Sequence, residues 1–204
     1  MNVKSAKAVL TAAAGKVAAD LKARHFARRG LKFVHDSADG EFVSLIEFQL
    51  SRSSTSAQLS FVINFGVIVP SLFGGSDISK PEYTSCHWGG RVSGKDGVES
   101  WWSVHAADDV DQLTVRLNSV LEAEVLPALA TMQREEDLIA LWKTGRGPGL
   151  GEAQRLLFLA TLLHRAGRRR EFEETRAELE GKARDSFGLN ALRKLNELRE
   201  PNDA

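Results

Sequence analysis

The sequence is poor in cysteine, the residue whose disulfides stabilise small proteins that lack a large hydrophobic core. Its 204 residues include one cysteine, Cys86, so an intramolecular disulfide is excluded. It also lacks any run of about 18 uninterrupted apolar residues, and we find no signal peptide. These absences predict a soluble cytoplasmic protein with no membrane association. Its length allows one domain of about 100 to 150 residues plus an appendage, held by hydrophobic packing alone.

Net charge is also missing, because 27 Lys and Arg residues balance 27 Asp and Glu residues. The balance is uneven along the chain. Residues 1–32 carry eight basic side chains and one acid, whereas residues 33–142 carry six basic side chains and sixteen acids. Nucleic-acid binding requires a basic face that displaces counterions from phosphates. We therefore expect no nucleic-acid partner, and we interpret the basic N-terminal segment as a solvated helix face.

The ligand sets that bind metals and phosphates are absent as well. Structural zinc needs four ligands in paired spacing and catalytic zinc needs three. The single cysteine and the five scattered histidines offer neither: His25, His35, His87, His105 and His164. The glycine-rich run 145–151 lacks the Lys-Ser/Thr pair of a P-loop. We expect no metal and no cofactor.

The strongest positive signal is the apolar run 58–70, QLSFVINFGVIVP. Its odd-numbered apolar residues share one face of a strand by the two-residue period, and we assign that face to the core: Leu59, Phe61, Ile63, Phe65, Val67 and Val69. The opposite face is half apolar and is interrupted by Asn64 and Gly66. A glycine inside a strand marks a bulge or a close backbone approach, and we favour packing over ligand binding as its reason.

The neighbouring segments predict an α+β fold. Residues 3–28 have the spacing of an amphipathic helix, and strands are expected at 31–35 and 41–52 around the turn Ser37-Ala38-Asp39-Gly40. After a loop containing Gly74, Gly75 and Ser76, two short strands are expected near 83–93 and 99–105. The sheet is thus mainly antiparallel, with about five strands and helices packed on it.

Helical spacing returns after Asp108, which with Asp109 offers cap acceptors. Pro127 must kink or end this helix, and another is expected at 135–143. A linker at 145–149 precedes three short helices separated at 166–167 and at Gly181. We expect an α+β domain at 1–144 and a helical C-terminal extension at 150–204.

Several short motifs along residues 4–142 resemble a family known only as the bacterial domain of unknown function numbered 4304. They are Leu21-Lys22, Phe26, Phe48-Gln49-Leu50-Ser51, Asn64-Phe65-Gly66-Val67, Cys86-His87-Trp88 with Arg91, and Trp101-Trp102. One departure is His25, where the resemblance implies a glycine. The resemblance implies an α+β body and no assigned activity.

The side chains most suited to binding or catalysis follow the apolar run 58–70. Three of the four tryptophans lie there with an arginine and two histidines, and aromatic and arginine side chains are favoured where partners are bound. We expect a recognition face formed by His87, Trp88, Arg91, Trp101, Trp102 and His105, with Gln49 and Asn64 as polar neighbours. Cys86 is expected to be buried and inert.

These observations favour a binding or interaction protein with a protein partner over an enzyme. A sharper version is neutralisation of a basic toxin by the acidic body. One alternative is a hydrolase or transferase that uses Cys86 or a nearby histidine. Another is a scaffold that oligomerises through the C-terminal helices.

Overall fold

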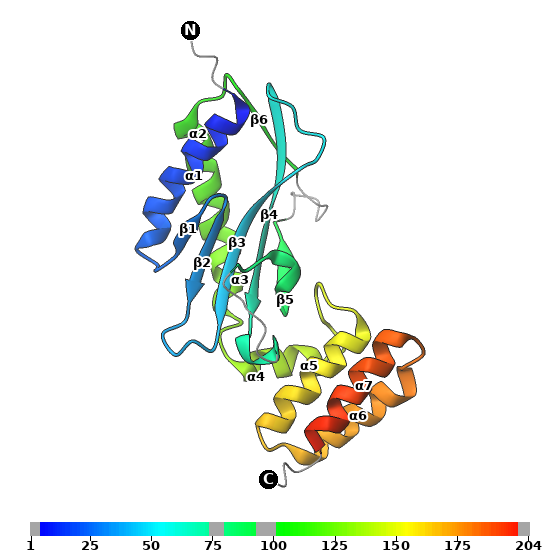
Figure 1. The fold of residues 1–204 in the computed structure, drawn as a ribbon. Coiled ribbons are helices and arrows are strands. Elements are labelled where there is room, and N and C mark those ends of the chain that lie inside the picture. The colour runs from blue at the N-terminus through cyan, green and yellow to red at the C-terminus, as the bar shows by residue number, and fades with distance from the viewer. Residues whose placement is uncertain (1–4, 74–79, 93–100, 200–204) are drawn as a thin grey trace. The chain divides into compact units, whose positions relative to one another are not determined.

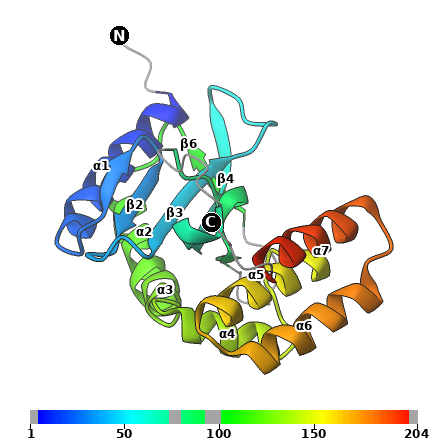
Figure 2. The same cartoon turned by 60° about the horizontal axis from the view of Figure 1, so that its bottom comes forward.

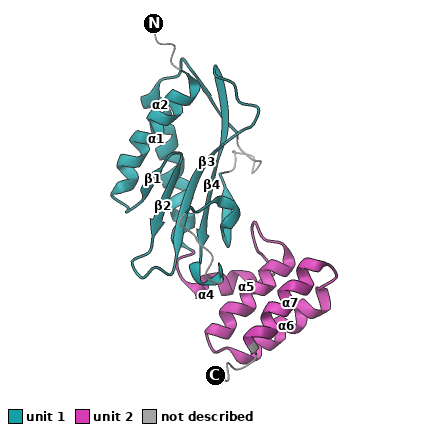
Figure 3. Ribbon diagram, in the orientation of Figure 1, with its two compact units in different colours: residues 1–131 teal, residues 132–204 magenta. Residues whose placement is uncertain are grey.

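The structure is a computed structural model that describes residues 5–73, 80–92 and 101–199. The chain divides into two compact units, residues 1–131 and 132–204 (Figure 3). Each unit is described by itself below. The boundary groups the helix Glu135–Lys143 with the second unit, whereas the sequence placed the division at the glycine-rich linker.

The first unit is an α+β domain built on a six-stranded sheet, which confirms the predicted fold class (Figure 1). The order is β1-β2-β3-β4-β5, and β6 pairs with β4 beyond the end of β5. All pairs are antiparallel. The strands are β1 (Ala27–Arg29), β2 (Lys32–Asp36), β3 (Val43–Leu50), β4 (Gln58–Ile68), β5 (Trp88–Arg91) and β6 (Trp102–His105).

The predicted turn between β2 and β3 forms a compact hairpin. Gly40 has a φ of 72°, a left-handed conformation that glycine adopts without steric cost. The hydroxyl of Ser37 accepts a hydrogen bond from the Phe42 N–H at 2.9 Å, and Asp39 accepts one from the Glu41 N–H at 3.0 Å. The hydrogen bond from Ser37 is the main reason that the pKa of Asp39 is lowered. Side chains therefore fix the register of β2 against β3.

Strand β4 is buried on both faces, which is more than its sequence predicted. The odd-numbered face is core as expected, with Phe61, Ile63 and Val67 fully buried. The other face is covered too, because Asn64 and Ile68 are 0% exposed. A Cβ at Gly66 would stand 2.6 Å from the Trp88 carbonyl oxygen and 2.7 Å from the Cys86 Sγ. The glycine is thus required by packing, as the sequence predicted.

Strands β5 and β6 lie one after the other along the same edge of β4. β5 pairs with residues 64–67 of β4 and β6 with residues 58–61. Strand β5 is shorter than predicted, because the segment Tyr83–Ser85 forms a 3-10 turn, η2, before it, and β6 begins at Trp102. The predicted strand ends Ser93 and Glu99, and the predicted loop Gly74-Gly75-Ser76, lie outside the described residues.

Helices cover the face of the sheet to which the odd-numbered residues of β4 point. Helix α1 (Ala6–Lys22) lies beside α2 (Val110–Val120), and α1 contacts β1, β4 and β6 (Figures 1 and 2). Asp109 caps α2 by accepting hydrogen bonds from the N–H groups of Asp111 and Gln112. The helix continues through a π turn, η3 (Leu121–Val125), into α3 (Leu126–Ala130). Pro127 lacks an N–H and cannot sustain a regular α-helix, so it distorts the helix as predicted.

The N-terminal helix ends six residues earlier than the predicted 28. The chain turns at His25, whose φ is 64°, and then forms β1 as a short edge strand that the sequence did not predict. The lack of glycine at this turn concealed the end of the helix, because glycine is the usual residue in a left-handed terminus. Residues 27–29 pair with β2 instead.

The second unit contains α4 (Glu135–Lys143), α5 (Glu152–Arg165), α6 (Arg169–Lys182) and α7 (Ser186–Arg199). Helix α5 contacts the other three. Arg155 is 4% exposed, pairs with Glu152 at 2.8 Å and donates to the carbonyl of Trp142, which ties α5 to α4. The break predicted at Gly181 is wrong, since α6 continues to Lys182, and Ala183 carries the turn.

Candidate functional site

Four polar residues stand directly opposite one another in four consecutive strands. Lys32 on β2 faces Glu47 on β3, Glu47 faces Asn64 on β4, and Asn64 faces Arg91 on β5. Opposite side chains in antiparallel strands point to the same face, about 5 Å apart. We call these four residues the polar row. They lie on the face of β4 opposite to the one that the helices cover.

Hydrogen bonds hold the β5 end of the polar row in one arrangement. The Arg91 Nε–H donates to Asn64 Oδ1 at 2.7 Å, and Asn64 Nδ2 donates to Gln49 Oε1 at 2.7 Å. Asn64 is 0% exposed, Arg91 is half-buried and Gln49 is exposed. A buried amide is costly unless both its ends are paired, and here both are. Three of the residues expected from the sequence therefore meet.

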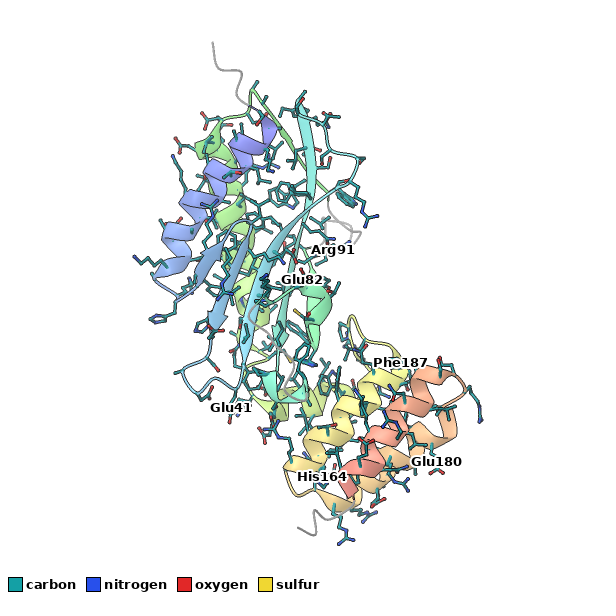
Figure 4. All side chains as sticks on the ribbon, in the orientation of Figure 1. Glu41, Glu82, Arg91, His164, Glu180 and Phe187 are labelled. Carbon is teal, nitrogen blue, oxygen red and sulfur yellow. The ribbon has the colours of Figure 1, made fainter. Side chains whose placement is uncertain are left out.

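Ion pairs hold the other end of the polar row. Lys32 Nζ lies 3.5 Å from a Glu47 carboxylate oxygen and 3.6 Å from one of Glu82. The Glu47 carboxylate also accepts a hydrogen bond from the Tyr83 N–H at 3.2 Å, which fixes η2 over the sheet. Figure 4 labels Arg91, at the β5 end of the row, and Glu82, the partner of Lys32.

Lys32 and Glu47 were not predicted as site residues, although the sequence contains a signal for Glu47. Glu47 and Gln49 alternate with buried Ile46 and Phe48, which places polar side chains on one face of an otherwise apolar strand. Lys32 could be matched to Glu47 only once the register across the hairpin was known.

Two tryptophans of the expected recognition face, Trp88 and Trp102, lie on the face of the sheet opposite to the polar row. Trp102 is opposite Phe61 on the helix-covered face, stacked against it at 5.9 Å, and the Arg116 guanidinium of α2 lies 5.2 Å from the centre of the Trp102 ring. Trp88 is 9% exposed and packs against Phe65. Trp88 is thus buried and Trp102 half-buried, and both rings lie on the face of the sheet opposite to Arg91.

His87 has a structural position as well. It is 3% exposed, and its Nδ1 accepts a hydrogen bond from the Val69 N–H at 3.0 Å. Its ring meets the ring of Phe73 edge-on, with centroids 4.9 Å apart. Burial lowers the pKa of the His87 imidazole to about 4. The ring is therefore neutral at neutral pH, and it closes the end of β4.

Trp101 and His105 are exposed, but they do not join the polar row. Trp101 is 51% exposed and precedes β6. His105 pairs with Gln58, whereas Arg91 pairs with Asn64, six residues further along β4. Six residues of strand span about 20 Å. The residues of the expected surface therefore lie in separate places: Gln49, Asn64 and Arg91 at the polar row, Trp88 and Trp102 on the opposite face, His87 in a buried position, and Trp101 and His105 at a remote end of the sheet.

Cys86 lies beside the polar row in an apolar environment, but it is half-buried rather than buried as expected. It packs with Tyr83 and Phe73 against a buried cluster of Val34, Val43, Leu45 and Ile68. Burial, followed by the negative charge of Glu47, raises the pKa of the Cys86 thiol to about 12. Burial also raises the pKa of Tyr83. A nucleophilic cysteine needs a lowered pKa and a neighbouring base, and Cys86 has the opposite environment.

The described residues, 5–73, 80–92 and 101–199, contain neither a candidate metal cluster nor a candidate membrane-spanning helix. No group of three or more His, Cys, Asp or Glu side chains converges there to hold a metal ion. Among the same residues no helix is both long enough and apolar enough to cross a bilayer.

The first unit is thus an α+β domain. Helices cover one face of its antiparallel sheet, and the polar row lies on the opposite face. The family described as "Domain of unknown function (DUF4304)" matches residues 17–131, and the chain belongs to this family. The match covers the sheet, η2, α2 and α3, and it confirms the expected membership. Comparisons with curated proteins and with solved structures give no match.

Proposed function

We propose that the α+β domain is a binding module that recognises a partner protein through the polar row and the exposed Gln49. The observation that carries the proposal is the register of Lys32, Glu47, Asn64 and Arg91 across four strands, with hydrogen bonds at one end and ion pairs at the other. A network fixed in advance lowers the entropy that binding must overcome, because its side chains are already ordered.

The charges of the polar row favour a protein over a polyanion. Two cations, Lys32 and Arg91, stand at the ends of the row with the acid Glu47 and the neutral Asn64 between them, and Glu82 adds a second acid. A phosphate backbone would be repelled by these acids. A folded protein or peptide offers both signs of charge, and arginine is enriched among the residues that contribute most to protein interfaces.

The excess of acids in residues 33–142 favours a basic partner, which includes toxin neutralisation by charge complementarity. A toxin encoded next to this chain is the partner to test first. Co-expression with the wild-type chain is expected to restore growth, and the Arg91→Ala variant is expected to restore less. Equal protection by the wild-type chain and the Arg91→Ala variant would show that the polar row does not contribute to neutralisation.

The direct test measures partner capture by matched variants of the full chain. Gln49→Ala removes an exposed contact, and Arg91→Ala removes the half-buried cation. Arg52→Ala, an exposed arginine outside the row, serves as the control. A partner held by wild type and by Arg52→Ala, but lost by Gln49→Ala and Arg91→Ala, supports the proposal. If circular dichroism shows both row variants to be folded and they capture the partner as well as wild type does, the proposal is rejected.

The enzyme alternative depends on Cys86 or a histidine close to it. The pKa of Cys86, raised to about 12, and the pKa of His87, lowered to about 4, favour binding over nucleophilic catalysis. Rapid alkylation of Cys86 in the native protein at neutral pH would support the enzyme instead.

A further inference from the structure

Helix α1 ends in a Schellman motif whose left-handed residue is a histidine. The Phe26 N–H donates to the Leu21 carbonyl at 3.2 Å and the His25 N–H donates to the Lys22 carbonyl at 3.0 Å, with His25 at a φ of 64°. Glycine adopts this conformation freely, whereas a residue with a Cβ is strained there. Backbone strain that a glycine would relieve is found most often where the side chain has a role.

His25 forms part of an open pocket of about 520 Å³ beside the end of α1. Small or apolar residues and nitrogen-bearing side chains line it together: Ala18, Lys22, His25, Phe26, Ala27 and Arg28. Lys22 and His25 are exposed and Arg28 is half-buried, so the pocket has a basic rim around an apolar wall. It lies at β1 and the end of α1, away from the polar row.

Backbone groups of the first unit fix Arg28 at the pocket. Its Nη2 donates to the Thr11 carbonyl at 3.0 Å, and its Nε donates to the Gly30 carbonyl at 2.8 Å. The guanidinium also crosses α1 at Gly15, where a Cβ would stand 3.0 Å from Nη1. Glycine is disfavoured inside a helix, and here it leaves the space that Arg28 occupies. The guanidinium is therefore held in place without an acidic partner.

The positive charge at the pocket is not neutralised by the protein. Among the described residues neither Lys22 nor Arg28 has a carboxylate within ion-pair distance, whereas nearby cations of the same unit do. The pairs are Lys16 with Asp111, Arg24 with Glu122, and Lys32 with Glu47. The carbonyl end of a helix attracts cations, which accounts for Lys22 but not for the strained His25 or the fixed Arg28.

We propose that this pocket binds a small phosphorylated ligand with an apolar substituent. Lys22 and Arg28 pair with its charge, the His25 imidazole donates an N–H to an oxygen, and Phe26 contacts the apolar part. A phosphate monoester presents three strong acceptor oxygens and nearly two negative charges, which suits a pocket whose lining includes two cationic side chains and an imidazole. The site is separate from the polar row and does not depend on the function proposed for it.

The test is titration of the isotope-labelled full chain with phenyl phosphate and with inorganic phosphate, followed by amide NMR. We expect saturable shifts at residues 18–28, and tighter binding of phenyl phosphate. Lys22→Glu should weaken binding about tenfold or more, as expected for loss of a charge-assisted contact. Lys7→Glu is the matched control, since it makes the same charge change on α1 about 22 Å away. Equal weakening by both variants would overturn the proposal.

His25→Gly separates a binding role from a structural one. Relief of the left-handed strain should raise the unfolding midpoint, while loss of the imidazole should weaken phenyl phosphate binding. A higher midpoint with unchanged affinity would show that His25 does not contribute. Phosphatidylcholine vesicles with and without phosphatidic acid distinguish the source of the phosphate: Lys22-dependent binding only to the acidic vesicles assigns the pocket to lipid headgroups. Failure of both phenyl phosphate and acidic vesicles to bind would reject the site.

Discussion

Asn64 and Arg91 stand opposite each other on β4 and β5, and the Arg91 Nε–H donates to the Asn64 side-chain oxygen at 2.7 Å. The hydrogen bond joins a fully buried amide to a half-buried cation and sets the orientation of the guanidinium. The proposed recognition surface and the stability of the first unit thus depend on the same pair.

Asn64→Ala is expected to lower the free energy of unfolding by about 1–3 kcal/mol, because Arg91 loses its acceptor and a cavity opens. Gln49→Ala, at the exposed end of the same network, should change it by no more than about 0.5 kcal/mol. Urea unfolding followed by circular dichroism measures both. Equal losses would mean that the hydrogen bond between Asn64 and Gln49, rather than burial of Asn64, determines the effect.

Gly66→Ala should destabilise the first unit by about 1–3 kcal/mol, because its Cβ would meet the Trp88 carbonyl oxygen at 2.6 Å. The carbonyl belongs to the backbone of β5 and cannot move without disturbing the pairing with β4. Gly181→Ala is the opposite control: it lies in α6 with no atom within 4 Å of an added Cβ, and should stabilise its unit by about 0.5–1 kcal/mol. Thermal unfolding of both variants checks the two signs.

Cys86 should resist alkylation until the protein unfolds. Its pKa is raised from 9.0 to about 12, so the thiolate fraction at neutral pH falls on the order of a thousandfold. Mass spectrometry after iodoacetamide treatment, with and without urea, measures the rate. Because the folded pKa exceeds the unfolded one, the contribution of Cys86 to stability is complete below pH 9 and is lost as pH rises toward 12. Equal rates in the native and unfolded chain would contradict this burial.

His87 should make the domain less stable in mild acid. Its pKa falls from 6.5 to about 4 on folding, so the unfolded chain takes up a proton first as the pH decreases. Stability from this group is complete above pH 6.5 and is lost down to pH 4, by about 3 kcal/mol at most. His87→Asn keeps an acceptor for the Val69 N–H and should reduce the pH dependence. The exposed His105→Asn should retain it, and unfolding curves at several pH values compare the two.

The scaffold alternative predicts self-association through α7. Phe187 and Leu189 are 51% and 58% exposed near the start of this helix, and apolar side chains exposed together mark contact surfaces. Figure 4 labels Phe187 on the second unit. If the chain oligomerises in this way, a Phe187→Ser/Leu189→Ser double variant should be a monomer by light scattering. The same mass for variant and wild type would exclude α7 as the contact.

The central strand was predictable because its odd-numbered apolar residues continue without a break from Leu59 to Val69. Arg91 was identified because it lies close in sequence to tryptophans and histidines, and Gln49 and Asn64 were identified as polar neighbours of that segment. The position of Trp102 relative to Arg91 was not predictable. The two belong to separate strands along β4, and side-chain direction cannot be counted through the residues between them. The end of α1 was not predicted because His25, and not the usual glycine, adopts the left-handed conformation there.

Strands β5 and β6 are each aligned by their own hydrogen bonds to β4, on one edge and in one direction. The number of residues between Arg91 and Trp102 therefore has no influence on which partners either strand meets. A longer connection between Arg91 and Trp102 should leave the same sheet, since lengthening a flexible connection costs little free energy. A reporter peptide inserted between these two strands is therefore expected to leave the pairing of both with β4 intact.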